Sequence, residues 1–205
     1  MAHCLSVRTG HDSVNEQTLA WINDLDSTDY GLRIEARQAL IECTEDISDI
    51  LIAVMMEERG RQSWEAGIIL SERHEPRAVE PMIRLLTSKH PTLGQVAAEA
   101  LGQYGCRYID ELLNAMPFCT PLTQIAIIKT LGMLNDRCAV APLINLLKSA
   151  ESSTIIHLTI KTLSDLGDPN AVAAIVVFKD HPDHHVRKSV TYALSALDKH
   201  LQNGD

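Results

Sequence analysis

Apolar side chains recur along the chain in two interleaved series that share one period. The first series is a leucine near the end of each small-residue segment, with steps of 30, 31, 30, 32 and 31 residues. The second series lies in the apolar segment that follows, with steps of 29, 30, 31 and 32 residues. A repeat of this length is typical of stacked helix pairs, because one pair cannot bury its apolar face alone. The leucine series is Leu40, Leu70, Leu101, Leu131, Leu163 and Leu194, and the second series is Ile50, Val79, Ile109, Val140 and Val172.

Each period therefore predicts two helices joined by polar turns. For the whole chain, the repeat predicts an all-α fold, a right-handed α-solenoid. A short first helix is expected to run through Trp21, because Ser13 followed by Glu16 forms a capping-box pattern. The later helices are expected over 31–44, 47–58, 62–73, 77–88, 92–103, 107–116, 121–134, 138–149, 153–166, 170–179 and 184–200.

The unbroken repeat predicts one domain. We expect a single solenoid over residues 13–201, with a flexible N-terminal tail over 1–12 and a flexible C-terminus over 202–205. Turn residues support these boundaries: Thr120 and Asp168 are predicted helix caps, each followed by a proline at the first helical position. Gly105 and Gly167 stand where helix ends favour a left-handed residue.

The composition limits the classes of function. Only 4% of the residues are aromatic although 45% are hydrophobic, so the core is expected to consist of Ala, Leu, Ile and Val. The formal net charge of -9 argues against nucleic-acid binding, since phosphate contacts need clustered Lys and Arg. The sequence shows no apolar run of the roughly 18 residues that span a membrane and no signal-peptide core. We expect a cytoplasmic protein without a membrane span.

The cysteines form no C-x-x-C pair and follow no common spacing. We interpret them as buried small side chains or free thiols in a reducing compartment, rather than as a disulfide framework. They are Cys4, Cys43, Cys106, Cys119 and Cys138.

Several segments resemble a known repeat. EPRAVEPMIRLL and DRCAVAPLINLL match each other, and VAAEALGQYG, SDLGDPNAVAAI and VRKSVTYAL resemble the HEAT-like repeat of phycobilisome lyase proteins. The resemblance covers residues 31–197 and implies about six HEAT-like helix pairs. The second repeat, SWEAGIILSERHEP, lacks the Leu-Gly pair, and the Val-Arg dipeptide of the repeat remains only as Leu32-Arg33 and Val186-Arg187.

Size and coverage resemble the small subunit of the E/F-type phycobilin lyases, or a related phycobiliprotein chaperone. This resemblance implies help in attaching a bilin covalently to a cysteine of a phycobiliprotein, with phycobilin as substrate and no tightly bound cofactor. The implied partners are a phycobiliprotein subunit and a second HEAT-repeat lyase subunit. Two alternatives remain open, a non-catalytic HEAT-repeat scaffold for protein–protein interaction and a factor that assembles or degrades phycobilisomes.

Variable columns of the repeat, located two, five and six residues before each leucine, are expected to face solvent on the concave side. Apolar residues among them indicate a ligand or partner groove. The alternative is that neighbouring repeats bury these positions. The groove candidates are Ile34, Trp64, Ile68, Glu99, Ile125, Lys129, Leu158, Lys161, Lys188 and Tyr192.

The same columns carry acidic residues in the first half of the chain and basic residues in the second, which would orient an asymmetric partner. Carboxylate arms of a bilin would lie at Lys129, Lys161 and Lys188, while Trp64 or Tyr192 offers a flat face. Scattered solvated surface charge is the alternative explanation.

Conventional catalytic motifs are absent from the sequence, and the catalytic residues remain unassigned, with His157 as the candidate proton donor. No metal site is expected. The histidines of HPDHH, His181, His184 and His185, lie in one turn without a second ligand set, and His74 belongs to a lone His-Glu pair in a turn.

Overall fold

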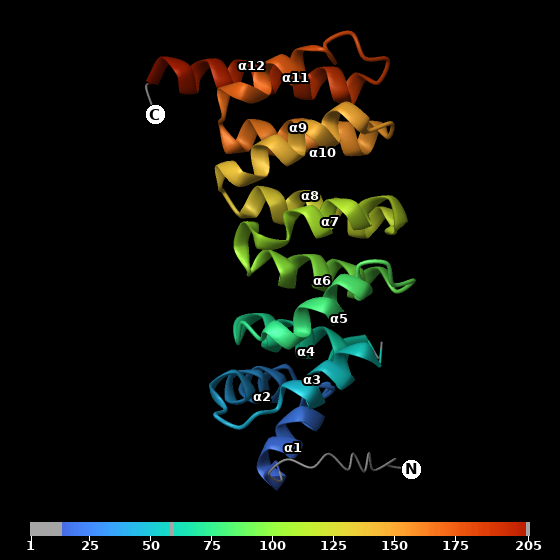
Figure 1. Ribbon diagram of the computed structural model, residues 1–205, viewed down its shortest axis with the longest axis vertical. Coiled ribbons are helices and arrows are strands. Elements are labelled where there is room, and N and C mark those ends of the chain that lie inside the picture. Colours follow the sequence, from blue (N-terminus) through green and yellow to red (C-terminus); the bar gives the residue numbers. More distant parts are fainter. Residues whose placement is uncertain (1–13, 58–59, 204–205) are drawn as a thin grey trace.

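The structure is a computed structural model and describes residues 14–57 and 60–203. Across those ranges all regular secondary structure is helical, with twelve α-helices and five short 3₁₀ turns. The helices stack into one elongated column, with the N-terminal and C-terminal helices at opposite ends (Figure 1). The predicted all-α solenoid is confirmed.

Two layers of helices build the column, because successive helices alternate between them. In each layer, every helix packs on the next member of the same layer. The first layer contains α2 (Tyr30–Glu42), α4 (Gly60–Glu72), α6 (Pro91–Gly102), α8 (Pro121–Met133), α10 (Ser153–Leu166) and α12 (His184–Asn203). The second layer contains α3 (Ser48–Met56), α5 (Val79–Leu85), α7 (Ile109–Ala115), α9 (Val140–Ser149) and α11 (Val172–Val176). Before these five pairs, α1 (Glu16–Asp24) packs on α2.

Most second-layer helices begin with a 3₁₀ turn, which accounts for the early starts of the predicted ranges. These turns are η1 (Pro76–Ala78), η2 (Gly105–Tyr108), η4 (Arg137–Ala139) and η5 (Pro169–Ala171); a further one, η3 (Met116–Phe118), follows α7. The predicted caps are confirmed, since Thr120 accepts a hydrogen bond from the Thr123 amide and Asp168 accepts one from the Asn170 amide.

The two ends of the predicted domain differ from the expectation. The cap of α1 is Asn15, which accepts from the Thr18 amide, rather than Ser13, which lies outside the described residues. The predicted tail over 1–12 also lies outside them. At the other end α12 continues to Asn203, so residues 202–203 are helical.

A left-handed residue ends the first helix of four successive repeats. It stands four positions after the buried leucine and has φ values of 51° at His74, 69° at Gly105, 47° at Asn135 and 69° at Gly167. The two glycines confirm the prediction. Asn and His are among the non-glycine residues that adopt this conformation most readily. The left-handed turn therefore accounts for a histidine at position 74.

The leucine series forms the centre of the core. Its first five members are 0% exposed, while Leu194 on the terminal α12 is half-buried. Val79, Ile109 and Val140 of the second series are also buried. The side chains of the two series therefore fill the space between the layers, as the shared period indicates.

Glycines allow the helices of the first layer to approach closely. A Cβ atom added at Gly102 on α6 would lie 2.3 Å from the Thr130 Cγ2 atom on α8, and one at Gly94 would lie 2.3 Å from the Thr123 Oγ1 atom. The Leu-Gly pair of the repeat thus sets the spacing between successive first-layer helices.

Among the described residues, no helix combines the length and the apolar character that a membrane crossing requires.

Candidate functional site

One predicted column forms an exposed row along the first layer. Glu99 on α6, Lys129 on α8 and Lys161 on α10 are exposed, each two residues before a fully buried leucine. Tyr192 continues the row on α12 and is 66% exposed. Because these helices are consecutive neighbours in the stack, the shared register places the side chains along one face. We call this set, together with Ile68 on α4, the first-layer row.

The other columns are less open than expected. Ile34, Trp64 and Ile125, six residues before the leucines, are half-buried, while Lys188 is exposed. Leu158 is half-buried and packs against the core.

Five residues before the leucines, Val96 and Ala126 are buried, so this column faces neighbouring helices rather than solvent. The columns five and six residues before each leucine are adjacent in sequence. A shift of one residue in the assumed register exchanges them, which is why the sequence did not distinguish them.

A depression of about 260 Å³ lies at the acidic end of the first-layer row, between α2, α4 and α6. It brings together two predicted residues, Ile68 and Glu99, with the acidic Glu72 on its wall. Its full lining is Arg37, Ile68, Ser71, Glu72, Val96, Glu99, Ala100 and Gln103. The depression combines apolar surface at Ile68 and Val96 with two carboxylates, Glu72 and Glu99, and one guanidinium, Arg37.

A buried carboxylate supports the helices beneath this depression. Glu65 on α4 is 4% exposed, and its oxygens lie 3.3 Å from the Arg37 Nη1 atom and 3.9 Å from the Arg33 Nε atom. Burial raises the pKa of the Glu65 carboxyl, although the two guanidinium groups oppose that shift. The group ties α2 to α4.

His157 binds two helices together. Its Nδ1 atom lies 2.5 Å from the Ser189 hydroxyl on α12, and that hydroxyl donates to the carbonyl of His185 at 3.0 Å. A hydrogen bond therefore joins the His157 ring nitrogen to the Ser189 oxygen. This is the geometry of a contact between α10 and α12, and the proton-donor role of His157 stays a prediction.

The arginines of the two retained Val-Arg positions have the same structural role. Arg33 donates to the carbonyl of Ser27 at 2.8 Å, and Arg187 donates to the carbonyl of His181 at 2.7 Å. Each arginine thus binds the turn six residues before it, which fixes the start of α2 and of α12.

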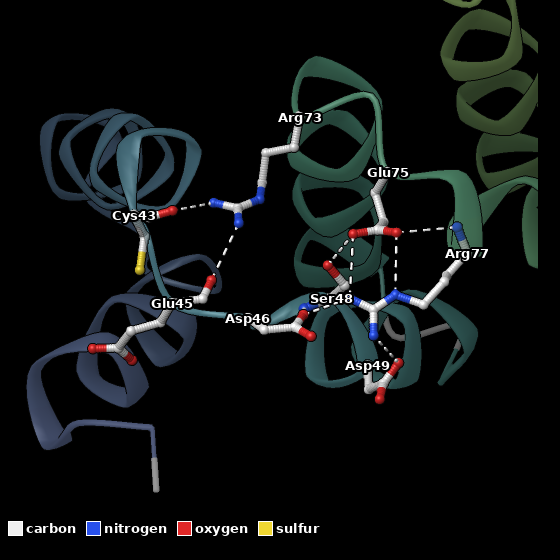
Figure 2. Close-up of polar contacts among 8 residues, drawn as sticks. All are labelled: Cys43, Glu45, Asp46, Ser48, Asp49, Arg73, Glu75 and Arg77. Carbon is white, nitrogen blue, oxygen red and sulfur yellow. Dashed lines mark hydrogen bonds and ion pairs between the residues drawn. The ribbon is translucent and has the colours of Figure 1, made fainter. Parts of the chain in front are cut away.

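Polar side chains fasten the first two repeats at their turns (Figure 2). Arg73, at the end of α4, donates to the carbonyls of Leu40 at 2.8 Å, Cys43 at 2.6 Å and Glu45 at 3.2 Å. These carbonyls follow or end α2 and have no helical donor, so the guanidinium completes their hydrogen bonding.

A second arginine joins the same turns. The Arg77 guanidinium contacts Asp46 at 2.5 Å, Asp49 at 3.3 Å and Glu75 at 3.1 Å, and the Ser48 hydroxyl donates to Glu75 (Figure 2). The hydrogen bonds from Arg77 hold the pKa values of the Asp46 and Glu75 carboxyls below their usual range.

Replacement of Glu75 by glutamine is expected to weaken the dependence of the melting temperature on pH in the acidic range. A lowered folded-state pKa stabilises the protein above the unfolded-state value and loses that effect as the pH falls through the folded-state value. Wild type should therefore have the higher melting temperature at pH 7, and the difference should decrease as the pH falls toward 3. Thermal unfolding between pH 3 and 7 measures this, with the exposed Glu80→Gln as control; an unchanged difference at pH 3 contradicts it.

Cysteine pairing corrects the sequence interpretation. Cys106 and Cys138 form a disulfide with a Cα–Cα distance of 6.1 Å, while Cys119 is buried and unpaired, as predicted, and Cys43 is unpaired. Their separation of 32 residues is one repeat. That period was the available signal, since it places equivalent turns side by side. Cys4 lies outside the described residues.

Potential metal ligands gather at the same turns. In the part of the chain that the structure describes, Cys106, Asp136 and Cys138 are the group whose ligand atoms lie within 4.8 Å of one another. The HPDHH histidines make other contacts: the His181 ring accepts from the Asp183 amide, and the rings of His184 and His185 pack edge to face.

Fold and site together define a helical-repeat protein with an exposed, charged row on one layer. The family described as HEAT repeats matches residues 109–195, and over this range the chain is similar to that family. No curated protein matches the chain.

Two solved structures are similar in fold. An engineered protein has 17% sequence identity and a TM-score of 0.46, with 91% of this chain and 98% of that chain covered. A designed armadillo repeat protein has 16% identity and a TM-score of 0.42, with 87% of this chain and 98% of that chain covered.

Proposed function

We propose that this chain is a scaffold that holds a segment of another protein along the first-layer row. The observation that carries the proposal is the exposure of Glu99, Lys129, Lys161 and Tyr192 at one register of consecutive helices. A row of this kind presents a continuous line of side chains, whereas scattered surface charges have no common register.

The charge order along the row defines the partner. Glu72 and Glu99 line the depression at Ile68 together with Arg37, whereas Lys129, Lys161 and Lys188 follow toward the C-terminal end. A complementary segment has a basic half, an acidic half and an apolar side chain that fits the depression. Opposed charges of this order fix the direction in which the segment binds.

The length of the row sets the size of that segment. Packed helices lie about 8–10 Å apart, so the four steps from α4 to α12 cover about 32–40 Å. A helix rises about 1.5 Å per residue, so a bound helix of about 24 residues reaches from one end to the other.

Two synthetic helical peptides test this scaffold function. One carries a basic half with a leucine near its outer end, to fit the depression at the acidic end of the row, followed by an acidic half. The other has the same composition with the charges mixed. The first should bind at least about tenfold more tightly, because two or more weak ion pairs add. Fluorescence anisotropy at low and high salt measures this.

A charge-reversal variant ties the binding to the row. Lys129→Glu combined with Lys161→Glu should abolish the preference for the first peptide, whereas Lys148→Glu on α9 of the second layer should retain it. Equal binding of the two peptides, or equal effects of the two variants, contradicts the scaffold proposal.

The finer proposal is that the partner is a phycobiliprotein subunit and that the chain assists bilin attachment, as the repeat resemblance implies. What supports it is an exposed aromatic ring beside ammonium groups. Tyr192 and Lys188 lie four residues apart on α12 and therefore share a face, and Lys161 lies on the neighbouring α10. A bilin would stack on the ring and place its propionates on the lysines.

An absorbance and fluorescence titration with free phycobilin tests the finer proposal. We expect a sharpened, red-shifted band that Tyr192→Ala or Lys161→Glu weakens, and bilin-loaded client after co-expression with phycobiliprotein subunits. A flat titration together with unloaded client contradicts bilin attachment and leaves the scaffold proposal standing on the peptide experiment.

A further inference from the structure

Equivalent turns of two neighbouring repeats face each other at Cys106 and Cys138. Cys106 lies in η2, the 3₁₀ turn that leads into α7, and Cys138 lies in η4, which leads into α9. Their Cα atoms are 6.1 Å apart, inside the range of about 4.4–6.8 Å that a disulfide spans. The bond therefore joins the third repeat (α6 and α7) to the fourth (α8 and α9).

Access distinguishes this pair from the unpaired cysteines. Cys106 and Cys138 are both half-buried, so both residues are partly open to solvent. Cys119 is buried, its thiol donates to the Ala115 carbonyl at 3.2 Å, and burial raises the pKa of that thiol. Cys43 is half-buried but has no second cysteine within bonding distance among the described residues.

Contacts other than the sulfur–sulfur bond also hold the two turns. Asp136 accepts from the Cys138 amide at 2.9 Å, and the Tyr104 hydroxyl donates to the Glu75 carbonyl at 2.9 Å. Ile109 and Val140, directly after the two turns, are buried in the core. These contacts do not depend on the disulfide, so they remain available when it is opened, as a reversible switch requires.

We propose that Cys106 and Cys138 form a reversible redox lock between the third and fourth repeats, closed by exchange with a glutathione-class disulfide. One cysteine thiolate attacks a sulfur of the small disulfide, forming a mixed disulfide and releasing one small thiol. The second cysteine thiolate attacks the protein sulfur of the mixed disulfide, forming the Cys106–Cys138 bond and releasing the second small thiol. The cysteines lose two electrons, the small disulfide gains them, and the two protons go to the released thiols.

The redox lock controls the width of a groove in the second layer. A shallow groove of about 560 Å³ lies between α7 and α9, with Leu113, Asn114, Pro142 and Leu146 in its lining. Since the disulfide joins the turns that begin these two helices, the oxidised protein holds one edge of the groove at fixed width. The reduced protein retains only the packing between neighbouring repeats at this point. This regulation is independent of the first-layer row.

Oxidation with glutathione disulfide and reduction with glutathione test the lock on the full chain. The oxidised protein should lose about 2 Da, and tryptic mapping should assign the bond to Cys106 and Cys138. Its melting temperature should exceed that of the reduced protein by about 5–10 °C, and the difference should reverse on reduction. Amide exchange in residues 105–149 should slow on oxidation.

Serine variants separate the lock from other thiol chemistry. Cys106→Ser and Cys138→Ser should each remove the oxidation-dependent shift in melting temperature, while Cys43→Ser should retain it. The proposal is overturned if oxidised wild type carries bound glutathione in place of the internal bond, or if its melting temperature does not change. It is also overturned if the reduced protein binds one Cd²⁺ through Cys106, Asp136 and Cys138 and resists oxidation, because the turns would then be a metal site.

Discussion

Replacement of Leu131 by alanine is expected to lower the free energy of unfolding by about 3 kcal/mol. Leu131 is 0% exposed, and it stands in the middle of the stack, where neighbouring repeats cover it on both sides. Removal of its side chain leaves a cavity that helices packed on both sides cannot fill. Urea unfolding measured by circular dichroism gives the value.

Met133 supplies the matched control, two residues further along the same helix. Its side chain is 79% exposed, so Met133→Ala is expected to change stability by less than about 0.5 kcal/mol. Equal losses for the two variants would show that the leucine series is not the centre of the core.

Replacement of Gly102 by alanine is expected to cost about 1–3 kcal/mol through overpacking. The new Cβ atom would lie 2.3 Å from the Thr130 Cγ2 atom, and Thr130 is buried on a helix where its side chain has few allowed rotamers. The helices α6 and α8 therefore have to separate. Urea unfolding of the variant measures the loss.

A double variant isolates the cause of that loss. Thr130→Ser removes the methyl group that the new Cβ atom would meet, so Gly102→Ala with Thr130→Ser should recover most of the stability lost in Gly102→Ala. If the two losses simply add, the close approach of α6 and α8 is not what the glycine provides.

The period of the leucine series was enough to predict the fold. A helix pair has one apolar face, and a series repeated about every 31 residues puts that face at the same place in every pair. The leucines consequently lie at the centre of the core. The predicted helix ranges agree with the structure apart from their 3₁₀ starts and the ends of two ranges, 77–88 and 170–179, where α5 ends at Leu85 and α11 at Val176. Local rules also predicted the caps at Thr120 and Asp168.

The surface was harder to predict than the core. The row containing Glu99, Lys129 and Lys161 is exposed as expected, but Val96 and Ala126 are buried although they belong to a column predicted to face solvent. The difference depends on how closely α4, α6, α8 and α10 approach, and that distance is set by contacts between repeats that no single segment contains.

Pairing between turns was missed for a related reason. Arg73 with Cys43, Tyr104 with Glu75, and Cys106 with Cys138 are each about one repeat apart in sequence. Inspection of neighbouring residues does not detect such pairs. Writing the repeats beneath one another brings them into adjacent rows, so the period itself contains this information.

The left-handed residues four positions after the leucines have a consequence for how such a chain changes length. Gly105 and Asn135 occupy the same point of two consecutive turns, and both have a positive φ, 69° and 47°. A deletion that joins Tyr104 directly to Asn135 removes one whole unit yet preserves the register of every remaining helix. The gene of such a protein can therefore lose or duplicate repeats without changes to the turns that connect them. The length of the solenoid then changes in steps of one repeat.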